Sequence, residues 1–346
     1  MSSKKPPVML IRADASPAIG GGHVMRCLAL AKAWQNAGGR VSWLMAESIP
    51  TLEERLLRED IPCTRMPSAP GSMPDASQTI AEAHRLDAAW VVVDGYRFAP
   101  DYIRTLKGSG LHVLFLDDDG QFDSYLADVV LNQNISASPA LYANRESLTR
   151  LLLGSVYVPL RPEFQAKRPR REQAPKGRKI LVTMGGSDPE NITEKVVQAL
   201  ARADLELKVV IGGGNPRSDE LTRLAESISS KIEIERSPDN MAPLMQRADI
   251  AISAAGSTCW ELAYMGLPAI VIPSSIDQQS IALGLAEQGV ALNLGWHANL
   301  SEEAVHDAAI GLLHDHKRRG SMSERGRKLI DGQGAARVVE YLQNSL

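Results

Sequence analysis

The sequence contains little cysteine, and its three cysteines, Cys27, Cys63 and Cys259, lie far apart and form no CxxC pair. This pattern argues against a disulfide framework or a zinc knuckle, and it fits a reducing compartment. The chain also lacks a run of about 18 apolar residues, and the apolar run before Arg12 is too short for a signal-peptide core. We therefore expect a cytoplasmic protein without stable membrane insertion.

Charge of one sign is not in excess either, because 38 lysines and arginines face 41 aspartates and glutamates, for a formal net charge of −3. This balance gives no general attraction to nucleic acid or acidic membranes, so an anionic ligand must be bound locally and no nucleic-acid partner is expected. The 44% of hydrophobic residues is ordinary for a globular protein. A chain of 346 residues exceeds what one hydrophobic core usually supports, which favours two domains.

Short apolar segments alternate with helical patterns in both halves of the chain. The segments expected to form strands lie near residues 7–11, 41–45, 90–94, 112–117 and 128–132, and near 179–184, 205–212, 231–235, 249–253, 268–273 and 290–294. The alternation predicts βαβ units, and continuous apolar runs are typical of parallel strands covered by helices on both faces. The predicted fold class is therefore α/β, with two doubly wound Rossmann-like domains.

A change of composition predicts the domain boundaries. Residues 161–178 combine prolines and basic side chains with few large apolar ones, and we favour a solvated linker over a segment that binds phosphate or nucleic acid. The N-terminal domain is then expected at 1–160 and the C-terminal domain at 179–330. The amphipathic stretch 331–346 is expected, by analogy of fold, to pack across the first domain as a helix.

Three glycines, Gly20, Gly21 and Gly22, lie between the first predicted strand and a helix that begins near His23. Glycine permits positive φ and close backbone approach at such a turn, and the amides at a helix start attract negative charge. Histidine ordinarily titrates near neutral pH, so His23 is a candidate general base, while simple packing at the turn is an equally open interpretation. The run departs from GxGxxG, so a dinucleotide site is not favoured.

The second half has a comparable loop at Gly185, Gly186 and Ser187, directly after a predicted strand. Asp188 is the expected N-cap of the following helix, and Pro189 its first residue. Glycines at this turn would let a phosphate approach the backbone without obstruction by side chains. We therefore expect a phosphate group of a ligand at this loop.

A small-residue turn at Gly256, Ser257 and Thr258 precedes another helix. Thr258 and Glu261 match the T-x-x-E capping box, in which Glu261 bonds amides of its own helix. Alternatively, Ser257 and Thr258 hold a diphosphate while Glu261 accepts hydrogen bonds from ribose hydroxyls, and the pattern leaves both interpretations open. The glycines at 212–214 are more typical of a turn than of a contact with the base.

An acidic run, Asp117, Asp118 and Asp119, follows a predicted strand. Carboxylates in such a run are potential ligands of a divalent metal. A run before Gly120 more often starts a turn, in which Asp118 bonds nearby backbone or substrate amides. We favour the turn and expect no metal.

Several strings resemble the PseG family of UDP-sugar hydrolases of pseudaminic acid biosynthesis, itself similar to the MurG-type UDP-GlcNAc transferases. They are IRADASPAIGGGHVMRCLALA at 11–31, VVVDGY at 91–96, FLDDDG at 115–120, VLNQN at 130–134 and GGSDPEN at 185–191. The segment GSTCWELAYMGLPAIVIP at 256–273 is shared more broadly with MurG-like proteins and indicates the nucleotide domain. The resemblance implies the glycosyltransferase-B architecture, with a nucleotide-sugar cleft between the two domains.

The resemblance also implies a reaction. UDP-2,4-diacetamido-2,4,6-trideoxy-β-L-altropyranose would be hydrolysed to UDP and the free sugar, with inversion at the anomeric carbon and without metal or cofactor. His23 matches the general base that activates water, and Glu261 matches the ribose ligand. A MurG-like sugar transferase and a non-catalytic nucleotide-sugar sensor are the alternatives; the oligomeric state is not indicated.

The sugar half of the site is expected in the first domain. By resemblance and by position at strand ends, its substrate-binding residues are Asp14, Gly20, Gly21, Gly22, Tyr96, Asn132, Asp277 and Gln278, of which the last two belong to the second half of the chain. The UDP-binding residues are Gly185, Gly186, Ser187, Gly256, Ser257, Thr258 and Glu261. Helix N-termini near Ser187 and Ser257 would stabilise the departing diphosphate.

Overall fold

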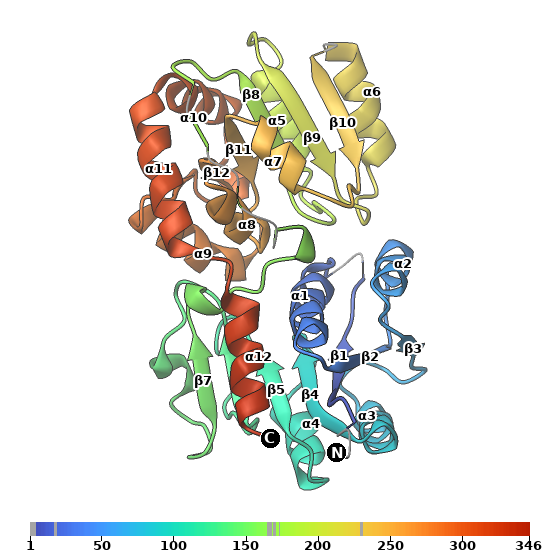
Figure 1. Cartoon of the computed structure of the whole chain (residues 1–346). Helices are drawn as coiled ribbons and strands as arrows, with labels where there is room; N and C mark the ends of the chain where they lie inside the picture. Colours follow the sequence, from blue (N-terminus) through green and yellow to red (C-terminus); the bar gives the residue numbers. More distant parts are fainter. Residues whose placement is uncertain (1–4, 17–18, 165–167, 169–170, 173, 229–230) are drawn as a thin grey trace. The chain divides into compact units, whose positions relative to one another are not determined.

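The computed structural model describes residues 5–346 apart from 17–18, 165–167, 169–170, 173 and 229–230, so that part of the expected linker lies outside the described residues. The chain divides into two compact units, which we call unit 1 (Met1–Pro162 with Gln333–Leu346) and unit 2 (Glu163–Gly332). Each unit has a central sheet with helices against it (Figure 1). Within the described residues, no helix is long and apolar enough to cross a membrane.

Unit 1 is built on a parallel sheet. Its strands are β1 (Val8–Ala13), β2 (Arg40–Met45), β3 (Cys63–Arg65), β4 (Ala88–Asp94), β5 (Val113–Leu116), β6 (Val129–Asn132) and β7 (Arg150–Leu153). Its helices are α1 (Gly22–Asn36), α2 (Pro50–Arg58), α3 (Met73–Leu86), α4 (Pro100–Gly108) and α12 (Gly334–Asn344). The strand order is β3-β2-β1-β4-β5-β6-β7, so the direction of winding reverses between β1 and β4.

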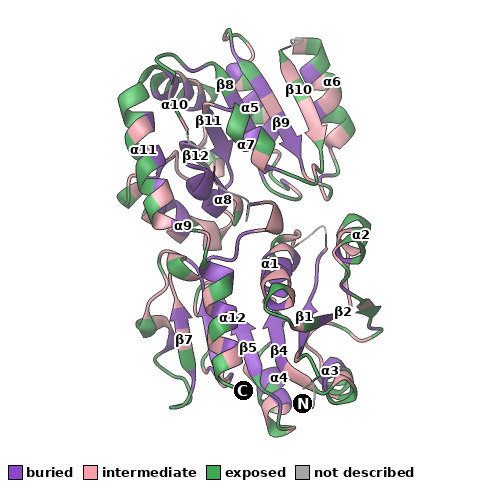
Figure 2. Cartoon of the chain, viewed as in Figure 1, coloured by how far each residue is buried: buried purple, intermediate pink, exposed green. Residues whose placement is uncertain are grey.

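The two faces of this sheet carry different helices because successive strand side chains point to opposite sides. Met9 and Ile11 of β1 pack in one core with residues of α1, α2 and α12, whereas Leu10 packs in a second core with residues of α3 and α4. Figure 2 shows the central strands buried between these layers. Arg12 follows Leu10 by two residues in β1, so its side chain points to the same face of the sheet, the face covered by α3.

The C-terminal helix α12 belongs to unit 1 although some 170 residues of unit 2 separate it from the rest of that unit. Val338, Val339 and Leu342 lie in the same core as α1. The indole Nε1 of Trp90 also donates a hydrogen bond to the carbonyl oxygen of Leu342, at 3.1 Å. The helix thus closes one face of the first sheet.

Unit 2 repeats the architecture. Its strands are β8 (Lys179–Thr183), β9 (Glu206–Ile211), β10 (Ile232–Arg236), β11 (Ile250–Ser253), β12 (Ala269–Val271) and β13 (Ala291–Asn293). Its helices are α5 (Ile192–Leu200), α6 (Ser218–Ile228), α7 (Ala242–Arg247), α8 (Thr258–Met265), α9 (Ile276–Glu287), α10 (Glu302–His314) and α11 (His316–Leu329). The parallel order β10-β9-β8-β11-β12-β13 places the reversal between β8 and β11. The predicted α/β class with two doubly wound domains is confirmed.

The sequence analysis missed the two edge strands of unit 1, β3 and β7. β3 has three residues, all at least partly exposed, and β7 has four, of which only Leu152 is fully buried. Edge strands have one neighbour and need no continuous apolar run, so the pattern that revealed the central strands is weak in them.

The basic segment 161–178 differs from the solvated linker that we expected, because from Glu163 onward it belongs to unit 2. Arg168 Nη1 donates hydrogen bonds to the carbonyl oxygens of Tyr264 and Ile330, both at 3.2 Å, and Arg171 Nη1 donates to that of Ala248 at 2.6 Å. The carbonyls at a helix C-terminus have no partner within their helix, and guanidinium groups satisfy them well. Part of the basic charge therefore fastens this segment to unit 2.

The packing of α12 predicts a selective loss of stability. Leu342→Ala should lower the free energy of unfolding of unit 1 by about 2–5 kcal/mol, because it leaves a cavity where Leu342 is fully buried. Leu346→Ala is the matched control, since this leucine is 60% exposed and its truncation should change the value by less than about 0.5 kcal/mol. Urea unfolding measures both; equal losses in the two variants would contradict the packing.

Candidate active site

The two reversal points identify where each unit is built to bind a ligand. In open parallel sheets, ligands bind outside the carboxyl ends of the strands at the point where the strand order reverses. In unit 1 this point lies beyond Ala13 of β1 and Asp94 of β4, which are direct partners in the sheet. In unit 2 it lies beyond Thr183 of β8 and Ser253 of β11, which are also partners.

His23 lies at the reversal point of unit 1, in the first turn of α1. Its side chain is largely buried, with 7% exposed. The imidazole meets the ring of Tyr96 edge to face, with centroids 4.9 Å apart and planes at 70°. Tyr96 follows β4 by two residues and remains 42% exposed. Two residues that the sequence placed in one site, His23 and Tyr96, are thus brought together.

The glycine loop before His23 needs glycine at one position for its backbone. Gly20 has φ +72° and its amide donates to the carbonyl oxygen of Ser16 at 2.8 Å, which closes the turn. A Cβ at Gly20 or Gly22 would meet no atom within 4 Å, whereas one at Gly21 would meet the side chain of Leu52. The backbone around Gly20 and Gly22 therefore has open space in front of it.

Arg26 binds two carboxylates at the ends of neighbouring strands. Its Nε and Nη2 each lie 2.7 Å from an oxygen of Asp94, and its Nη1 lies 2.6 Å from Oδ1 of Asp118. Asn134 Nδ2 donates to the same Oδ1 at 3.1 Å. We call Arg26, Asp94 and Asp118 the arginine clamp. It connects α1 to the ends of β4 and β5.

Asp94 is fully buried, yet it stays ionised because of its neighbours. Burial by itself raises the pKa of Asp94, but the charge of Arg26 and then that of His23 act in the other direction, and the pKa is held below its ordinary value. The Cys27 thiol also donates to Asp94, at 3.3 Å. A negative charge therefore lies close to His23.

The structure makes Asn132 a framework residue rather than an exposed sugar ligand. Its Nδ2 donates to the Asp118 carbonyl at 3.0 Å and to Tyr142 Oη at 2.7 Å, and its Oδ1 accepts from the Asn134 amide at 2.9 Å. It has no exposed surface. The nitrogen and the oxygen of its side-chain amide are both hydrogen-bonded, so Asn132 supports the turn after β5.

The acidic run at 117–119 forms the predicted turn, but Asp117 rather than Asp118 bonds its backbone, because the Asp118 carboxylate is paired with the side chains of Arg26 and Asn134. Gly120 has φ +74° and its amide donates to Asp117 Oδ2 at 2.8 Å, as does Tyr142 Oη at 2.8 Å. Burial raises the pKa of Asp117 above its ordinary value, since the hydrogen bonds it accepts come from neutral groups. Among the described residues, no group of three or more carboxylate, histidine or cysteine side chains is arranged to hold a metal ion.

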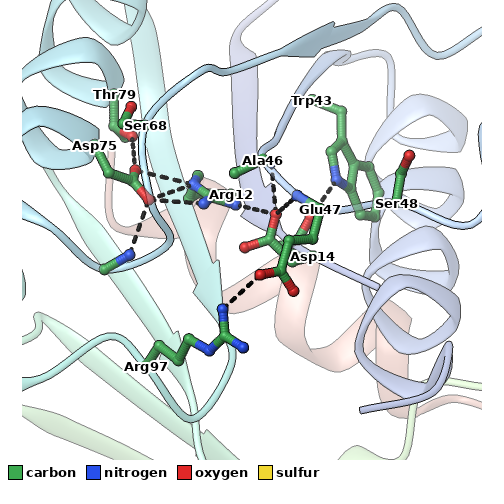
Figure 3. Close-up of polar contacts among 12 residues, drawn as sticks. Arg12, Asp14, Trp43, Ala46, Glu47, Ser48, Ser68, Asp75, Thr79 and Arg97 are labelled. Carbon is green, nitrogen blue, oxygen red and sulfur yellow. Dashed lines mark hydrogen bonds and ion pairs between the residues drawn. The ribbon is translucent and has the colours of Figure 1, made fainter. Parts of the chain in front are cut away.

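Asp14, predicted to bind substrate, is committed to the framework through one oxygen. Oδ1 accepts from the amides of Ala46 and Glu47, at 2.7 and 3.1 Å, and forms an ion pair of 2.7 Å with Arg12 Nη1 (Figure 3). Arg12 in turn holds Asp75 with Nε at 3.0 Å and Nη2 at 2.7 Å. This network ties β1 to α3 and to the loop after β2.

In unit 2, the loop after β8 leaves backbone exposed at Gly185 and Gly186, with Ser187 partly exposed. Gly185 has φ +83° and a Cβ there would meet open space. The predicted cap differs in detail: α5 begins at Ile192, four residues after Asp188, so Pro189 lies in the preceding turn and not in the helix. Between Asp188 and the start of the helix the backbone is not helical, since Asp188 and Asn191 both adopt positive φ.

Asp188 nevertheless caps α5 with its side chain. Its two oxygens accept from the amides of Ile192 and Thr193 at 2.9 and 3.0 Å. These amides are therefore already paired with a carboxylate, which makes the start of α5 a poor site for a phosphate. The expectation that the helix near Ser187 stabilises a diphosphate loses its support.

The glycines at 212–214 pack against this loop, which agrees with the turn that we favoured. A Cβ at Gly212 would lie 2.4 Å from the carbonyl oxygen of Gly186, and the Gly214 amide donates to the same oxygen at 3.0 Å. Glycine at 212 is required because two backbones touch there.

The second loop of unit 2 leads directly into α8. The helix begins at Thr258 with Ser257 as N-cap, and the Ser257 side chain makes no capping bond. The predicted capping box is therefore wrong in register, since Thr258 is already the first helical residue and Glu261 the fourth. Ser257 is exposed, Gly256 and Thr258 are partly exposed, and Glu261 is 6% exposed. The start of α8 thus has no side-chain cap from Ser257, whereas Asp188 caps the start of α5.

Gln278 faces this second loop, whereas Asp277 lies beside it at the start of α9. Gln278 Oε1 accepts from the Ser274 amide at 3.0 Å, which fixes the side-chain amide. Its Nε2 lies 3.8 Å from the position of a Cβ at Gly256. Unit 2 thus brings Gln278 next to Gly256, although the sequence analysis assigned Gln278 to the sugar and Gly256 to UDP.

Sequence reasoning missed the arginine clamp. A signal was present, because Arg26 lies three residues after His23 within the run VMRCLALA, where an arginine on an apolar helix face requires a buried partner. The partners could not be found, since they come from segments 68 and 92 residues away in the chain.

The sequence of unit 2 matches a known domain, the Glycosyltransferase family 28 C-terminal domain, over residues 179–336. The crystal structure of MurG from Acinetobacter baumannii has the same fold, with a TM-score of 0.66 at 22% identity over 98% of this chain and 100% of that one. The fold is therefore that of the glycosyltransferase-B proteins.

Three relatives are similar over most of the chain. The spore coat polysaccharide biosynthesis protein SpsG of Bacillus subtilis is 32% identical over 67% of this chain and 69% of its own. The UDP-2,4-diacetamido-2,4,6-trideoxy-beta-L-altropyranose hydrolase of Campylobacter jejuni is 24% identical over 81% and 97%. The UDP-N-acetylglucosamine--N-acetylmuramyl-(pentapeptide) pyrophosphoryl-undecaprenol N-acetylglucosamine transferase of Chromobacterium violaceum is 26% identical over 93% and 95%.

The chain thus has the glycosyltransferase-B fold, and its residues 179–336 match the family 28 C-terminal domain. Among proteins with this fold, the chain belongs to the family of SpsG. The C. jejuni hydrolase is less similar to this chain than SpsG is, so the expected membership of the PseG family is not established.

Substitution of the two buried aspartates of unit 1, Asp94 and Asp117, should lower stability by unequal amounts. Asp94→Asn should lower the free energy of unfolding at pH 7 by about 3 kcal/mol, because it removes one partner of a buried ion pair. Asp117→Asn should cost clearly less, because burial disfavours the ionised form that it removes. Urea unfolding measures both differences.

The stability difference between the wild type and Asp94→Asn should change with pH in the opposite direction to the difference between the wild type and Asp117→Asn. The pKa of Asp94 is lowered, so its contribution is fully present above the unfolded value of about 4 and is lost as pH falls further. The pKa of Asp117 is raised, so the wild type loses stability relative to Asp117→Asn as pH rises above about 4. Changes of the same sign from pH 3.5 to 7 would contradict these assignments.

Proposed function

We propose that this protein hydrolyses UDP-2,4-diacetamido-2,4,6-trideoxy-β-L-altropyranose to UDP and the free sugar, with inversion at the anomeric carbon. The observation that carries the proposal is the position of His23, held against Tyr96 beside the ionised Asp94 at the reversal point of unit 1. The C. jejuni relative, whose name states this reaction, is similar over 97% of its length.

In the proposed reaction His23 acts as general base. It takes a proton from a water molecule whose oxygen attacks the anomeric carbon, and the bond from that carbon to the diphosphate oxygen breaks with its electron pair on UDP. Direct displacement by one water inverts the configuration. An imidazolium forms as the proton is transferred, and the negative charge of Asp94 stabilises it.

Unit 2 is proposed to bind the UDP. The start of α8 has no side-chain cap from Ser257, so its amides are the better position for the diphosphate, and Gly185 and Gly186 offer a second stretch of exposed backbone. Glu261 is proposed to accept hydrogen bonds from the ribose hydroxyls, because it lies in the first turn of the same helix. Gln278, next to Gly256, would meet the sugar or its phosphate.

A sugar transferase is the second candidate function, and the 26% identity to the C. violaceum transferase over 93% of this chain favours it. The two candidates share the UDP site and differ in the attacking group, water or an acceptor hydroxyl. Release of free sugar without any acceptor distinguishes them.

His23→Gln should abolish the release of UDP from the UDP-sugar, by about 100-fold or more, because glutamine cannot take the proton. The Kd for UDP should stay within a factor of two, since the proposed UDP site is in unit 2. A coupled assay of UDP release and calorimetric titration with UDP measure the two quantities.

A measurement in EDTA and the outcome for His23→Gln can each contradict the proposed mechanism. Release by the wild type should persist in excess EDTA, and complete loss that Mg²⁺ restores would exclude the metal-free mechanism. Undiminished UDP release by His23→Gln would exclude His23 as the base, and release only with an added acceptor would favour the transferase.

Glu261→Gln should remove the preference for ribose over deoxyribose. The wild type should bind UDP about 10-fold more tightly than 2′-deoxy-UDP, as expected for loss of one hydrogen bond to a charged group, and the variant should bind the two almost equally. Glu303→Gln, at an exposed position of α10, is the control and should keep the preference. An unchanged preference in Glu261→Gln would refute the assignment.

A further inference from the structure

Arg26 is a buried arginine that neither the sequence reasoning nor the proposed reaction uses. It is 8% exposed and spends all three guanidinium nitrogens on carboxylates, Nε and Nη2 on Asp94 and Nη1 on Asp118. A buried ion is retained only when its charge is compensated and its hydrogen bonds are made. The clamp therefore has one low-energy arrangement, which makes it a rigid connection.

The clamp fixes the part of α1 that carries His23. His23 and Arg26 are three residues apart in the helix and so lie on the same side of it. The two-bond contact with Asp94 fixes the rotation of the helix about its axis, and the contact with Asp118 fixes its distance from β5. Tyr96, whose ring meets that of His23, follows Asp94 by two residues in the chain.

The clamp also sets the charge beside His23. Arg26, Asp94 and Asp118 together carry one negative charge. Among the described residues, two neutral groups also lie on this side of α1: Tyr96, whose ring meets that of His23, and Cys27, whose thiol pKa burial raises well above its ordinary range. His23 is also one of the charges that lower the pKa of Asp94, so the interaction is mutual.

We propose that Arg26 is the positioning residue of this site: through Asp94 and Asp118 it holds His23 in place, and it keeps the net charge of the arginine clamp beside His23 at −1. The proposal rests on the proposed function of His23 as base. Arg26 itself touches neither water nor sugar in this scheme.

Four variants distinguish the effect of the clamp on the position of His23 from its effect on the charge beside His23. Arg26→Lys keeps the charge but loses the two-pronged geometry, and the double variant Arg26→Met with Asp94→Asn keeps one negative charge but loses the clamp. Arg26→Met leaves two negative charges, and Asp118→Asn leaves none while keeping the contact of Arg26 with Asp94.

The two variants that lose the geometry, Arg26→Lys and the double variant, should lower kcat by about 100-fold, as a displacement of about 1 Å does. Their KM and their Kd for UDP should change less than about threefold. Full kcat in Arg26→Lys would overturn the positioning role.

The two variants that change the charge should move the acid limb of the kcat profile in opposite directions. Arg26→Met should move it to higher pH and Asp118→Asn to lower pH, each on the order of one pH unit. Shifts in the same direction, or none, would overturn the charge role. Asp118→Asn and Arg26→Lys carry the test should Arg26→Met not fold.

Asp75→Asn is the matched control. It breaks an equally buried pair, in which both Nε and Nη2 of Arg12 contact Asp75, but this pair lies on the opposite face of the sheet. The variant should lose stability and leave the acid limb in place. A shift as large as that of Arg26→Met would show that any damage to unit 1 moves the limb.

A readout that needs no turnover separates this proposal from the proposed function. The imidazole signals of His23, assigned by their loss in His23→Gln, are followed by NMR against pH in each variant. The midpoint should move up in Arg26→Met and down in Asp118→Asn. Absence of UDP release in the wild type would refute the proposed function alone, and unmoved midpoints would refute the clamp alone.

Discussion

The charge pair between Arg26 and Asp94 is the interaction on which the organisation of unit 1 depends. Both groups are buried, and neither is tolerated there without the other because an unpaired buried ion costs several kcal/mol. The pair forms only when α1 lies against the carboxyl ends of β4 and β5. One electrostatic requirement thus selects the helix position that places His23 beside Tyr96.

The opposite face of the same sheet uses the same device. Arg12 joins Asp75 on α3 with Asp14 at the end of β1, and so holds the loop that follows β2 (Figure 3). In unit 2, the helices that follow the two loops differ in how their first turns are capped. Asp188 caps the start of α5, while the start of α8 has no side-chain cap from Ser257.

Much of this fold follows from the sequence, because central parallel strands are buried on both faces and must be continuously apolar. The pattern therefore identified β1, β4 and β8 but failed for β3 and β7, whose positions at the edges require no such run. Local motifs likewise placed His23 and Gly20 at a strand-to-helix turn.

What the sequence could not provide is the choice of partner between distant polar residues. Asp14 and Asn132 were assigned to substrate because they end strands, and only the structure shows their oxygens and amides bonded within the protein. The register of the capping box failed for a similar reason, since Ser257 and Thr258 both suit an N-cap and tertiary packing decides between them.

The central claim is that water activated by His23 attacks the anomeric carbon. Hydrolysis of the UDP-sugar in ¹⁸O-labelled water tests it most directly, with mass spectrometry of both products and NMR of the anomer first formed. The account predicts that the label enters the sugar, with inverted configuration, and that UDP contains none. Label in UDP would show that water attacks phosphorus, which His23 at a sugar site could not explain.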